Sequence, residues 1–494
     1  MPWSDGAMPE HAPRTLREVE VQQWDRSCDV AIVGLGIAGA CAALEARRGG
    51  ADVLVIERAS AGGGASALSS GIFYFGGGNA VQHACGYEDD ADAMFDFLAA
   101  STEAVDRDAL RAFCDNPVAQ FDWLEAQGLP FERRSFESKA RPGQLNATFG
   151  LLSTGNEKAW PWSLITKPTL RGHKVAAAGE RAGAIAMQPL LARCEEEGVE
   201  SIYDTAATAL VVNNAERVVG VRARQDRLDI SVRARRGVIL ATGGFGLNSE
   251  MVREHVPGVG DNAEPLGIPT NDGSGVLLGV SAGAATRDLG GIIATCSIYP
   301  PEQLINGVIV NKEGRGFVAE DAYHGRLAAF IMEQPDQTAW LIVNEENFAY
   351  PEAGHKLIDG WETIAQMERD LGVPQGSLER TLADYNRDAK GRVDRRFHKH
   401  ADYLKPLDIG PGAAFDLSFK RSPYVFLTLG GLRTSLNGEA LDASGAPLAG
   451  LYALGACAAH LPRDGKGYAS GLSLAPGSFF GRQAGRHAAD AAVA

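Results

Sequence analysis

The chain has 494 residues, of which 45% are hydrophobic, and a formal net charge of −15 at pH 7. A chain of this length can form two or three domains with large hydrophobic cores. The acidic balance argues against nucleic acid and anionic membrane surfaces as partners, because binding to phosphate groups needs clustered Lys and Arg.

The first residues and the cysteines bear on the cellular compartment. Residues 1–24 are polar, without an apolar stretch of signal-peptide length, and no 18 uncharged apolar residues run together. Seven scattered cysteines, without CxxC or CxxCH spacing, indicate a reducing compartment and no metal site. We therefore expect a frayed tail over residues 1–24, no transmembrane segment and a cytoplasmic location.

A strand, a glycine-rich turn, a helix and a second strand are predicted near the start. A β-branched run ends at Val33, Gly34, Gly36 and Gly39 follow in GxGxxG spacing, and the second run ends at Glu57. These glycines would allow a tight turn, the approach of a pyrophosphate and close helix packing, while the acid would bond a ribose hydroxyl. The unit predicts dinucleotide binding, although a purely structural glycine turn is the alternative, and it does not distinguish nicotinamide from flavin.

Three later stretches favour a flavin. They are the Gly- and Ser-rich run that begins at Glu57, "ATGG" from Ala241, and "GLYALGACA" from Gly450. A nicotinamide enzyme needs one glycine turn, whereas a flavin dinucleotide held along its whole length uses several. We therefore expect FAD, bound noncovalently.

With these motifs the chain resembles the flavoprotein family of fumarate reductase and succinate dehydrogenase flavoprotein subunits, which includes the 3-ketosteroid dehydrogenases. The resemblance covers about residues 27–490 and includes "TNDGSG" from Thr270 and "VNKEGRGF" from Val310, in the family's order. It implies an α/β fold, with a Rossmann-type FAD-binding domain and an inserted mixed α+β substrate domain. The FAD site that we predict consists of Gly34, Gly36, Ala38, Gly39, Glu57, Arg58, Gly64, Ala65, Ser66, Ser70, Gly71, Ala207, Ala241, Thr242, Gly243, Asn248, Asp272, Gly273, Gly455, Ala456, Gly471, Leu472, Ser473 and Leu474.

The expected domain order places the FAD-binding domain in residues 25–288 and 423–494 and the substrate domain in residues 289–422. Within the first part, Asn213-Asn214 is a turn signal between alternating strands. The substrate domain is strand-like at "GVIVN" and helical at 361–372 and 377–390. The aperiodic segment 133–164 carries Trp160 and Trp162, and is interpreted either as a loop over the active site or as irregular surface.

The segment "GKGYASGLSL", from Gly465 to Leu474, bears on the substrate. In the family's dicarboxylate reductases, arginines hold a substrate carboxylate in this loop and deliver a proton after the "VNxxGxRF" stretch. The aligned positions here hold Tyr468 and the pair Tyr323-His324. Without guanidinium groups a dicarboxylate would be desolvated and unpaired, so fumarate reduction is not expected.

The same loop resembles the 3-ketosteroid dehydrogenases that desaturate between carbons 4 and 5, and it lacks the "YPGPG" version of the enzymes that act between carbons 1 and 2. By that resemblance Tyr468 would hold the 3-keto oxygen of a steroid or similar polycyclic ketone. Ser470 would take the proton from carbon 4, and Tyr323 would polarise Ser470 and pass the proton towards solvent. Hydride from carbon 5 would go to FAD, and an unidentified acceptor would reoxidise it.

Alternatives remain at this point. The structural alternative is that Tyr468 is a core residue and Ser470 a turn residue. His324 and His460 are further acid–base candidates, although a lone histidine is more often structural. Other enzyme functions are a 3-ketosteroid 1-dehydrogenase and a flavin-dependent ene-reductase. An electron-transfer subunit that depends on partner proteins is disfavoured, because the cysteine clusters and haem motifs of such systems are missing.

Overall fold

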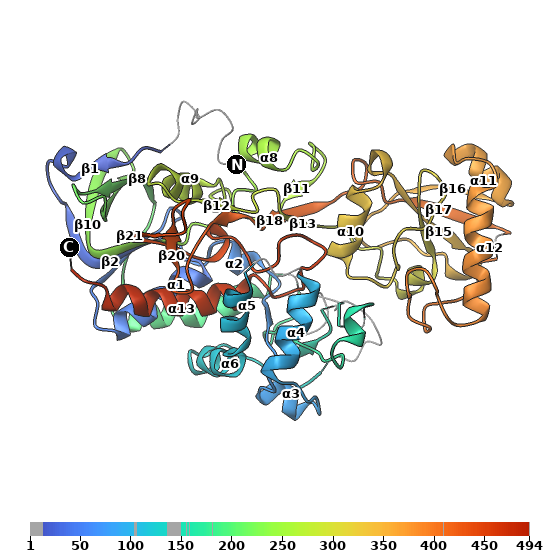
Figure 1. The fold of residues 1–494 in the computed structure, drawn as a ribbon, viewed down its shortest axis with the longest axis horizontal. Helices are drawn as coiled ribbons and strands as arrows, with labels where there is room; N and C mark the ends of the chain where they lie inside the picture. The colour runs from blue at the N-terminus through green and yellow to red at the C-terminus, as the bar shows by residue number, and fades with distance from the viewer. Residues whose placement is uncertain are drawn as a thin grey trace.

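The structure, a computed structural model, describes residues 13–102, 106–135, 150–154, 156–157, 159–179, 181–408 and 410–493. The fold is elongated, with a large central sheet at one end and a smaller antiparallel sheet at the other (Figure 1). A group of helices lies along one side, between the two ends. The predicted α/β class is confirmed.

Among the described residues the central sheet has nine strands in the order β1-β8-β9-β10-β2-β3-β7, with β21 paired to β10 and β20 to β21. The last part of the long strand β10 lies between β2 and β21, to which it is parallel, so the start and the end of the chain meet in this sheet. The strands are β1 (Leu16–Arg17), β2 (Arg26–Val33), β3 (Val53–Ile56), β7 (Glu200–Ile202), β8 (Thr205–Val212), β9 (Val218–Gln225), β10 (Leu228–Leu240), β20 (Glu439–Leu441) and β21 (Pro447–Ala453).

Two helices pack closely against each other on one face of this sheet. They are α1 (Ile37–Arg48), which is rich in alanine, and α13 (Leu474–Asp490). A Cβ atom on Gly481 would lie 2.5 Å from the carbonyl oxygen of Ala38, and one on Gly485 would lie 2.3 Å from that of Ala42. Glycine at these positions therefore permits the close approach of the two backbones.

The far end of the molecule contains a four-stranded antiparallel sheet with its own apolar core. The chain enters this end after β13 and returns through β18, and these two strands pair with each other and form a small sheet with β11. The elements are β11 (Glu264–Pro265), β13 (Ile292–Thr295), β14 (Val308–Asn311), α10 (His324–Met332), β15 (Ala339–Asn344), β16 (Leu357–Trp361), α11 (Ile364–Leu371), α12 (Ser377–Lys390), β17 (Gly412–Asp416) and β18 (Val425–Thr428).

A third group of elements, which we call the side unit, lies below the central part in Figure 1. Its short strands pair in the order β4-β6-β5. Its interior holds the buried ion pair Arg171–Asp89, with 2.7 Å between Nη2 and Oδ1. The elements are β4 (Ile72–Tyr74), α3 (Ala80–Ala84), α4 (Ala91–Ser101), α5 (Arg107–Cys114), α6 (Pro117–Ala126), β5 (Gly150–Leu152) and β6 (Gly172–Lys174).

One further long helix, α7 (Gly183–Glu196), packs against α1 and α2. The remaining elements are short: α2 (Gly64–Leu68), α8 (Ser249–His255), α9 (Ser274–Ser281), β12 (Thr286–Arg287) and β19 (Gly431–Leu432).

The start of the described chain corrects one expectation. Leu16 and Arg17 form β1 and pair in parallel with Val211 and Val212, and the buried Leu16 packs against Val211 and Val219. These residues belong to the fold and are not a frayed tail, because a short apolar contact and two strand pairs tie them to the sheet. Residues 1–12 lie outside the described part.

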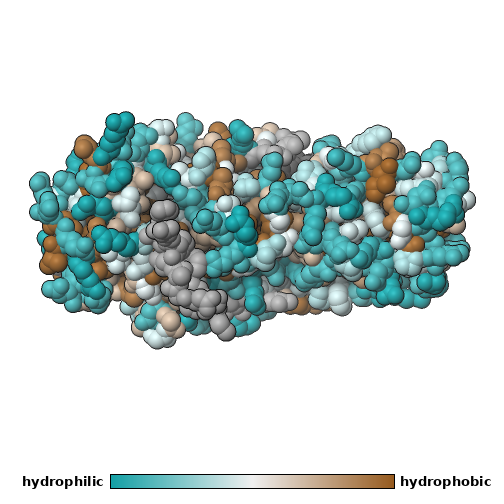
Figure 2. All heavy atoms as spheres, turned by 90° about the horizontal axis from the view of Figure 1, so that it is seen from above, coloured by the Kyte–Doolittle hydropathy of each residue, from teal (hydrophilic) through white to brown (hydrophobic). Residues whose placement is uncertain are grey.

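The surface is mainly polar on the face seen in Figure 2, where hydrophobic residues form small separate patches. No helix in the described part of the chain is long and apolar enough to cross a membrane. The described residues also contain no group of three or more His, Cys, Asp or Glu side chains arranged to hold a metal ion.

Candidate cofactor and substrate site

A cavity of about 700 Å³ begins at the turn between β2 and α1 and extends to the loop before α13. Its walls come from distant parts of the chain: the turn at Gly34, the backbone at Ala241, strands β13 and β18, the start of α10 and the loop that contains Tyr468. Cavities of this size hold a cofactor or a drug-sized ligand. The cavity is therefore large enough for both predicted functions, cofactor binding and substrate binding, to be considered together.

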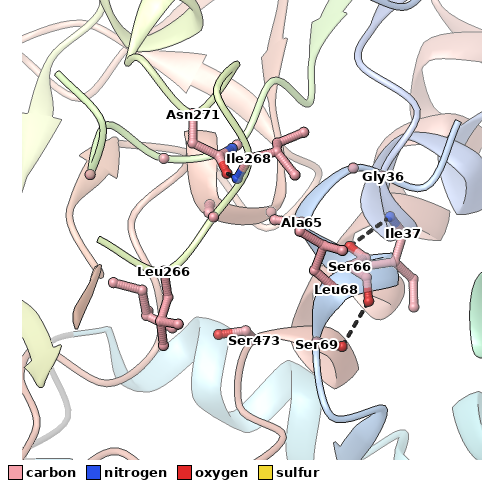
Figure 3. A pocket seen from close by; sticks show the side chains of 18 of the residues that line it. Gly36, Ile37, Ala65, Ser66, Leu68, Ser69, Leu266, Ile268, Asn271 and Ser473 are labelled. Carbon is pink, nitrogen blue, oxygen red and sulfur yellow. Dashed lines mark hydrogen bonds between the residues drawn. The ribbon is translucent and has the colours of Figure 1, made fainter. Parts of the chain in front are cut away.

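The three glycines of the GxGxxG turn differ in their surroundings. Gly34 has a φ of +101°, and a Cβ there would lie 2.4 Å from the carbonyl oxygen of Ala241. A Cβ on Gly39 would lie 2.1 Å from the carbonyl oxygen of Gly34. A Cβ on Gly36, in contrast, would meet only the Ser66 hydroxyl at 3.4 Å. Gly34 and Gly39 thus permit close packing, while Gly36 leaves space on the cavity side (Figure 3).

Glu57 lines the cavity at the end of β3 and is 5% exposed. Its Oε2 accepts a hydrogen bond from the Leu35 backbone N–H at 2.7 Å, and its Oε1 accepts one from the Ala59 N–H at 2.8 Å. A carboxylate has about four acceptor positions, so capacity remains for a hydroxyl in the cavity. The carboxylate fixes the turn and still faces the site.

A second loop is tied to the start of α1. The Ile37 N–H donates to Ser66 Oγ at 3.2 Å, and Ser69 Oγ donates to the Ser66 carbonyl at 2.7 Å (Figure 3). Gly63 and Gly64, at the start of α2, have φ values of +114° and +51°. The Gly- and Ser-rich run therefore folds over the helix N-terminus, where backbone N–H groups favour phosphate.

Most of the predicted cofactor residues line this one cavity, and six do not. Gly39 packs beneath Gly34, Leu472 is fully buried, and Asn248 donates from its side chain to the carbonyl of Asp272 at 2.9 Å, behind the wall. The residues that line it are Gly34, Gly36, Ala38, Glu57, Arg58, Gly64, Ala65, Ser66, Ser70, Ala207, Ala241, Thr242, Gly243, Gly455, Ala456, Gly471, Ser473 and Leu474. Those that do not are Gly39, Gly71, Asn248, Asp272, Gly273 and Leu472.

One wall of the cavity was missed by sequence reasoning. Leu266 and Ile268 form it, and Asn271 Oδ1 holds their loop by accepting from the Ile268 N–H at 2.9 Å (Figure 3). Asn271 belongs to the "TNDGSG" motif, so the motif could have indicated it as a cavity residue. Leu266 and Ile268 lie in an aperiodic stretch that carries no motif.

The three predicted catalytic residues come together although Tyr323 lies far from Tyr468 and Ser470 in the sequence. The hydroxyl oxygens of Tyr323 and Ser470 are 3.0 Å apart, and Tyr468 is nearby on the same wall. Tyr323 is the N-cap residue of α10, and Tyr468 and Ser470 lie on the loop before α13. The ring of His324 lies over that of Tyr323, with 4.1 Å between centroids.

The glycines around Tyr468 have a packing explanation. A Cβ on Gly467 would lie 2.4 Å from the Ser101 carbonyl oxygen, and one on Gly471 would lie 2.4 Å from the Tyr74 backbone nitrogen. Ser101 and Tyr74 both belong to the side unit. Glycine therefore lets the loop that contains Tyr468 press directly against the side unit, while Tyr468 and Ser470 line the cavity.

The polar groups at this end of the cavity are neutral. Burial raises the pKa of the Tyr323 and Tyr468 phenols, so both remain protonated hydrogen-bond donors near neutral pH. Burial also lowers the pKa of His324 and of His460 to about 4. Among the described residues that line the cavity, the guanidinium groups are those of Arg58 and Arg181, so neither the start of α10 nor the loop before α13 presents one to it.

Half of the segment 133–164 lies outside the described residues, but both tryptophans are described. The Arg326 guanidinium lies 4.1 Å from the Trp162 ring centroid, and the Trp160 ring stacks on His398 at 4.3 Å. Arg326 belongs to α10, one turn after Tyr323. The described part of this segment therefore contacts the substrate-side elements, although neither tryptophan lines the cavity.

Comparison with known proteins identifies the family. A family model for an FAD binding domain matches residues 29–467. The chain belongs to this FAD-binding family. FAD is accordingly the cofactor, and the turn at Gly36, the Glu57 carboxylate and the Ser66 loop fit it, because they leave space and acceptor capacity where a pyrophosphate and a ribose would bind.

Individual members of the FAD-binding family extend the match. The chain is 35% identical to a solved 3-ketosteroid-delta4-(5alpha)-dehydrogenase from Rhodococcus jostii RHA1 in complex with 4-androstene-3,17-dione, with a TM-score of 0.90 over 97% of this chain and 100% of that one. It is 29% identical to a 3-oxo-5-alpha-steroid 4-dehydrogenase of Comamonas testosteroni, over 88% of this chain and 93% of that protein. A probable fumarate reductase of Shewanella frigidimarina is 26% identical, over 94% and 75%.

Proposed function

We propose that this protein is an FAD-dependent 3-ketosteroid 4-dehydrogenase, which introduces a double bond between carbons 4 and 5 of a saturated 3-ketosteroid. One observation carries the proposal: Tyr323, Tyr468 and Ser470 meet in a cavity that continues from the dinucleotide turn. The similarity to the Rhodococcus jostii enzyme, which was solved with a steroid bound, supports the same substrate class.

The cavity walls near the hydroxyl groups suit a steroid. Ile293 on β13 and Val425 and Leu427 on β18 present apolar side chains to the cavity. A steroid nucleus is apolar, and its burial against such walls is favourable by roughly 25 cal/mol per Å². A single polar group at one end then fixes the orientation of the ligand.

Tyr468 is assigned to the 3-keto oxygen. Its buried phenol is protonated, so it donates a hydrogen bond to the ketone. Removal of a proton from carbon 4 places negative charge on that oxygen, because the carbanion is an enolate. A donor already aimed at the oxygen stabilises this charge more strongly in a water-poor site than in water.

Ser470 is assigned to the proton on carbon 4, with Tyr323 behind it. A serine hydroxyl is a poor base alone, so it needs a neighbour that accepts its own proton as the new one arrives. Tyr323 Oη lies 3.0 Å from Ser470 Oγ and would meet this need by releasing its own phenolic proton towards solvent as it takes the proton of Ser470. FAD, when bound, accepts the hydrogen of carbon 5 as hydride.

The chain order supports a domain proposal as well. We propose that residues 25–288 and 423–494 form the FAD-binding domain and that residues 289–422 are inserted as the substrate domain. The pairing of β21 with β10 and the packing of α13 on α1 support the first grouping. The separate core of the four-stranded sheet supports the second.

We also propose the cellular location of the enzyme and the class of partner that reoxidises its cofactor. We expect a cytoplasmic location, which the seven free thiols support, because disulfides are rare there. An electron acceptor of unidentified chemistry would reoxidise the cofactor. Fractionation of cells and a screen of acceptors with the reduced enzyme test both points.

The function is tested with the purified FAD-loaded chain under anaerobic conditions. A saturated 5α-3-ketosteroid should bleach the flavin absorbance, and the product should carry a new double bond between carbons 4 and 5. The 5β isomer tests stereochemical preference. Bleaching by a 4-ene-3-ketosteroid, with a 1,4-diene product, would instead identify a 1-dehydrogenase. Oxidation of the reduced enzyme by enones, without any reaction of saturated ketones, would identify an ene-reductase.

A further inference from the structure

Ser473 begins helix α13 but does not cap it. It is the N-cap residue, and its carbonyl accepts the first helical bond, from the Gly477 N–H at 3.1 Å. A serine at this position usually accepts a hydrogen bond from an N–H of the first turn, and that bond is missing here. The side chain therefore breaks a local rule, which is typical of positions held for function.

The hydroxyl of Ser473 instead bonds Tyr468. The two hydroxyl oxygens are 3.0 Å apart, and both side chains line the cavity. In Figure 3 the Ser473 hydroxyl points into the cavity, towards the side formed by Leu266. The backbone of Ser473 is fixed by the start of a 17-residue helix, so it is a rigid anchor for the phenol.

The direction of this bond follows from the proposed role of Tyr468. A phenol has one proton, and Tyr468 can donate it to the ketone oxygen only if it does not donate it to Ser473. The phenol oxygen then accepts a proton from Ser473, whose hydroxyl rotates freely enough to donate. A donor that itself accepts a hydrogen bond is polarised and becomes a stronger donor. In the same sense, the bond from Ser473 lowers the pKa of the Tyr468 phenol against the effect of burial.

We propose that Ser473 is a positioning residue for the reaction: it donates to the Tyr468 oxygen, so that the phenol is aimed at the substrate ketone and is a stronger donor. This inference rests on the proposed function of the site. It predicts that Ser473 acts only through Tyr468, and this distinguishes it from a residue that contacts FAD or supports the fold.

The kinetic test is a double-mutant cycle in the FAD-loaded protein, followed by single-turnover flavin reduction with a saturated 5α-3-ketosteroid. Ser473→Ala should slow the reduction about 3- to 10-fold, which corresponds to one neutral hydrogen bond. Ser473→Thr keeps a hydroxyl and should restore most of the rate. In a Tyr468→Phe background, Ser473→Ala should have no further effect, because the bond that it removes is already lost.

A spectroscopic readout separates positioning from a structural role. The carbonyl stretch of a bound 4-ene-3-ketosteroid, labelled with ¹³C at carbon 3, should rise in frequency in Ser473→Ala, because its hydrogen bond weakens. Ser478→Ala is the matched control: Ser478 is a buried serine of the same helix, bonded to Gln120 and to the Ala475 carbonyl, and it does not line the cavity. It should leave the stretch unchanged.

The outcomes are decisive in each case. An unchanged rate of flavin reduction in Ser473→Ala overturns the inference, and so does a loss of rate in the Tyr468→Phe background equal to that in the parent protein. A loss of FAD affinity in Ser473→Ala that parallels the loss of rate also overturns it and assigns Ser473 to the cofactor. If the parent protein neither reacts with nor binds the steroid, the proposed function fails separately. The pKa of Tyr468, followed by NMR of ¹³Cζ-labelled tyrosine without any steroid, then tests the bond: it should rise in Ser473→Ala, and no rise refutes the bond.

Discussion

At the scale of single residues, Glu57 shapes the turn at which FAD is proposed to bind. Its two oxygens accept from the Leu35 and Ala59 backbone N–H groups. An amide at this position keeps the shape of the side chain but presents two donors on one arm. That arm can no longer accept a bond from the backbone, and the charge near the ribose is lost.

Glu57→Gln should therefore weaken FAD binding while the protein stays folded. The loss of a charge-assisted hydrogen bond is worth roughly 1.5–3 kcal/mol, or about 10- to 150-fold in affinity. Fluorescence titration of the apoprotein with FAD measures it. Glu200→Gln, which removes an exposed partner of Arg26, is the control and should have no effect. Equal FAD affinity in both variants would contradict the assignment of Glu57.

Tyr323 is the residue on which the proposed proton step depends. Tyr323→Phe keeps the buried ring but leaves Ser470 without its hydroxyl partner. General-base catalysis contributes about 10²- to 10⁴-fold, so a loss of that order is expected in single-turnover flavin reduction. Because the two groups act on one step, adding Ser470→Ala should cost less than the product of the single effects.

The control for this experiment is Tyr452→Phe. Tyr452 is also buried, but it bonds His487 on α13 and does not line the cavity. This variant should bind FAD and reduce it at the parent rate. If Tyr323→Phe behaves in the same way, Ser470 has another partner, and His324, whose ring lies over Tyr323, is the next residue to test.

At the scale of elements, the contact between α1 and α13 joins the first and last parts of the chain. It depends on glycines that differ in their surroundings. A Cβ on Gly485 would lie 2.3 Å from the Ala42 carbonyl oxygen, whereas one on Gly477 would meet only the Ile37 side chain, at 3.7 Å, and Gly455 Cα at 3.9 Å. The first contact is with rigid backbone and the second is an ordinary van der Waals contact.

The two glycines should therefore respond to alanine with opposite signs. Gly485→Ala forces the helices apart and should lower the free energy of unfolding by about 1–3 kcal/mol. Gly477→Ala removes backbone freedom inside a helix without a clash and should raise it by up to about 1 kcal/mol. Urea unfolding of the FAD-free proteins measures both. Stabilisation by both substitutions would show that the helices are free to separate.

The elements that the sequence predicted are those with strong local signals. The strand, turn and helix at Gly34 are confirmed, as is the hairpin at Asn213, whose side chain accepts from the Ala215 and Arg217 N–H groups. The two helices expected near 361–372 and 377–390 are α11 and α12. The side unit was not foreseen, because its strands are three residues long and carry no readable periodicity.

The site was predictable to a similar degree. Glycine motifs have fixed spacing, so most of the residues predicted from them line the cavity, while the contacts that they make with FAD stay predictions. The contact between Tyr323 and Ser470 spans 147 positions, and only the family resemblance indicated it. The bond between Tyr468 and Ser473 and the wall at Leu266 depend on side-chain directions in loops, which no local pattern in the sequence encodes.

At the scale of the whole molecule, the catalytic end of the site exists only where three parts meet. Tyr468 lies on a loop that leads into the central helices, Tyr323 begins a helix of the far end, and Gly471 presses on the side unit. A shift of any one part by an ångström would change the distances between the hydroxyl groups. Such misplacement can lower the rate about 100-fold, so the activity should depend on the correct packing of all three parts against one another.

Two neutral histidines lie at this meeting point, His460 buried and His324 partly buried, and they make stability depend on pH. Burial lowers the pKa of His324 and His460 to about 4 in the folded protein, from an ordinary value of 6.5. Between these values the unfolded chain takes up protons that the folded chain does not. The contribution of the two neutral histidines to the free energy of unfolding is therefore fully present above pH 6.5 and is lost as the pH drops towards 4. One pKa unit corresponds to about 1.4 kcal/mol, so each histidine accounts for roughly 3 kcal/mol over the full interval.

The variant His324→Gln/His460→Gln should accordingly lose less stability on acidification than the parent does. Its unfolding free energy at pH 7.5 should be lower, because His460 Nδ1 donates to the Leu429 carbonyl at 3.1 Å and that bond is disturbed. Between pH 6.5 and 4.5, however, its curve should be flatter, since two proton-binding groups of the unfolded chain are gone. Urea unfolding at several pH values, at one saturating FAD concentration, measures the slope. His83→Gln, at an exposed position, should keep the parent slope. A double variant whose slope equals that of the parent would assign the acid sensitivity to carboxylates instead.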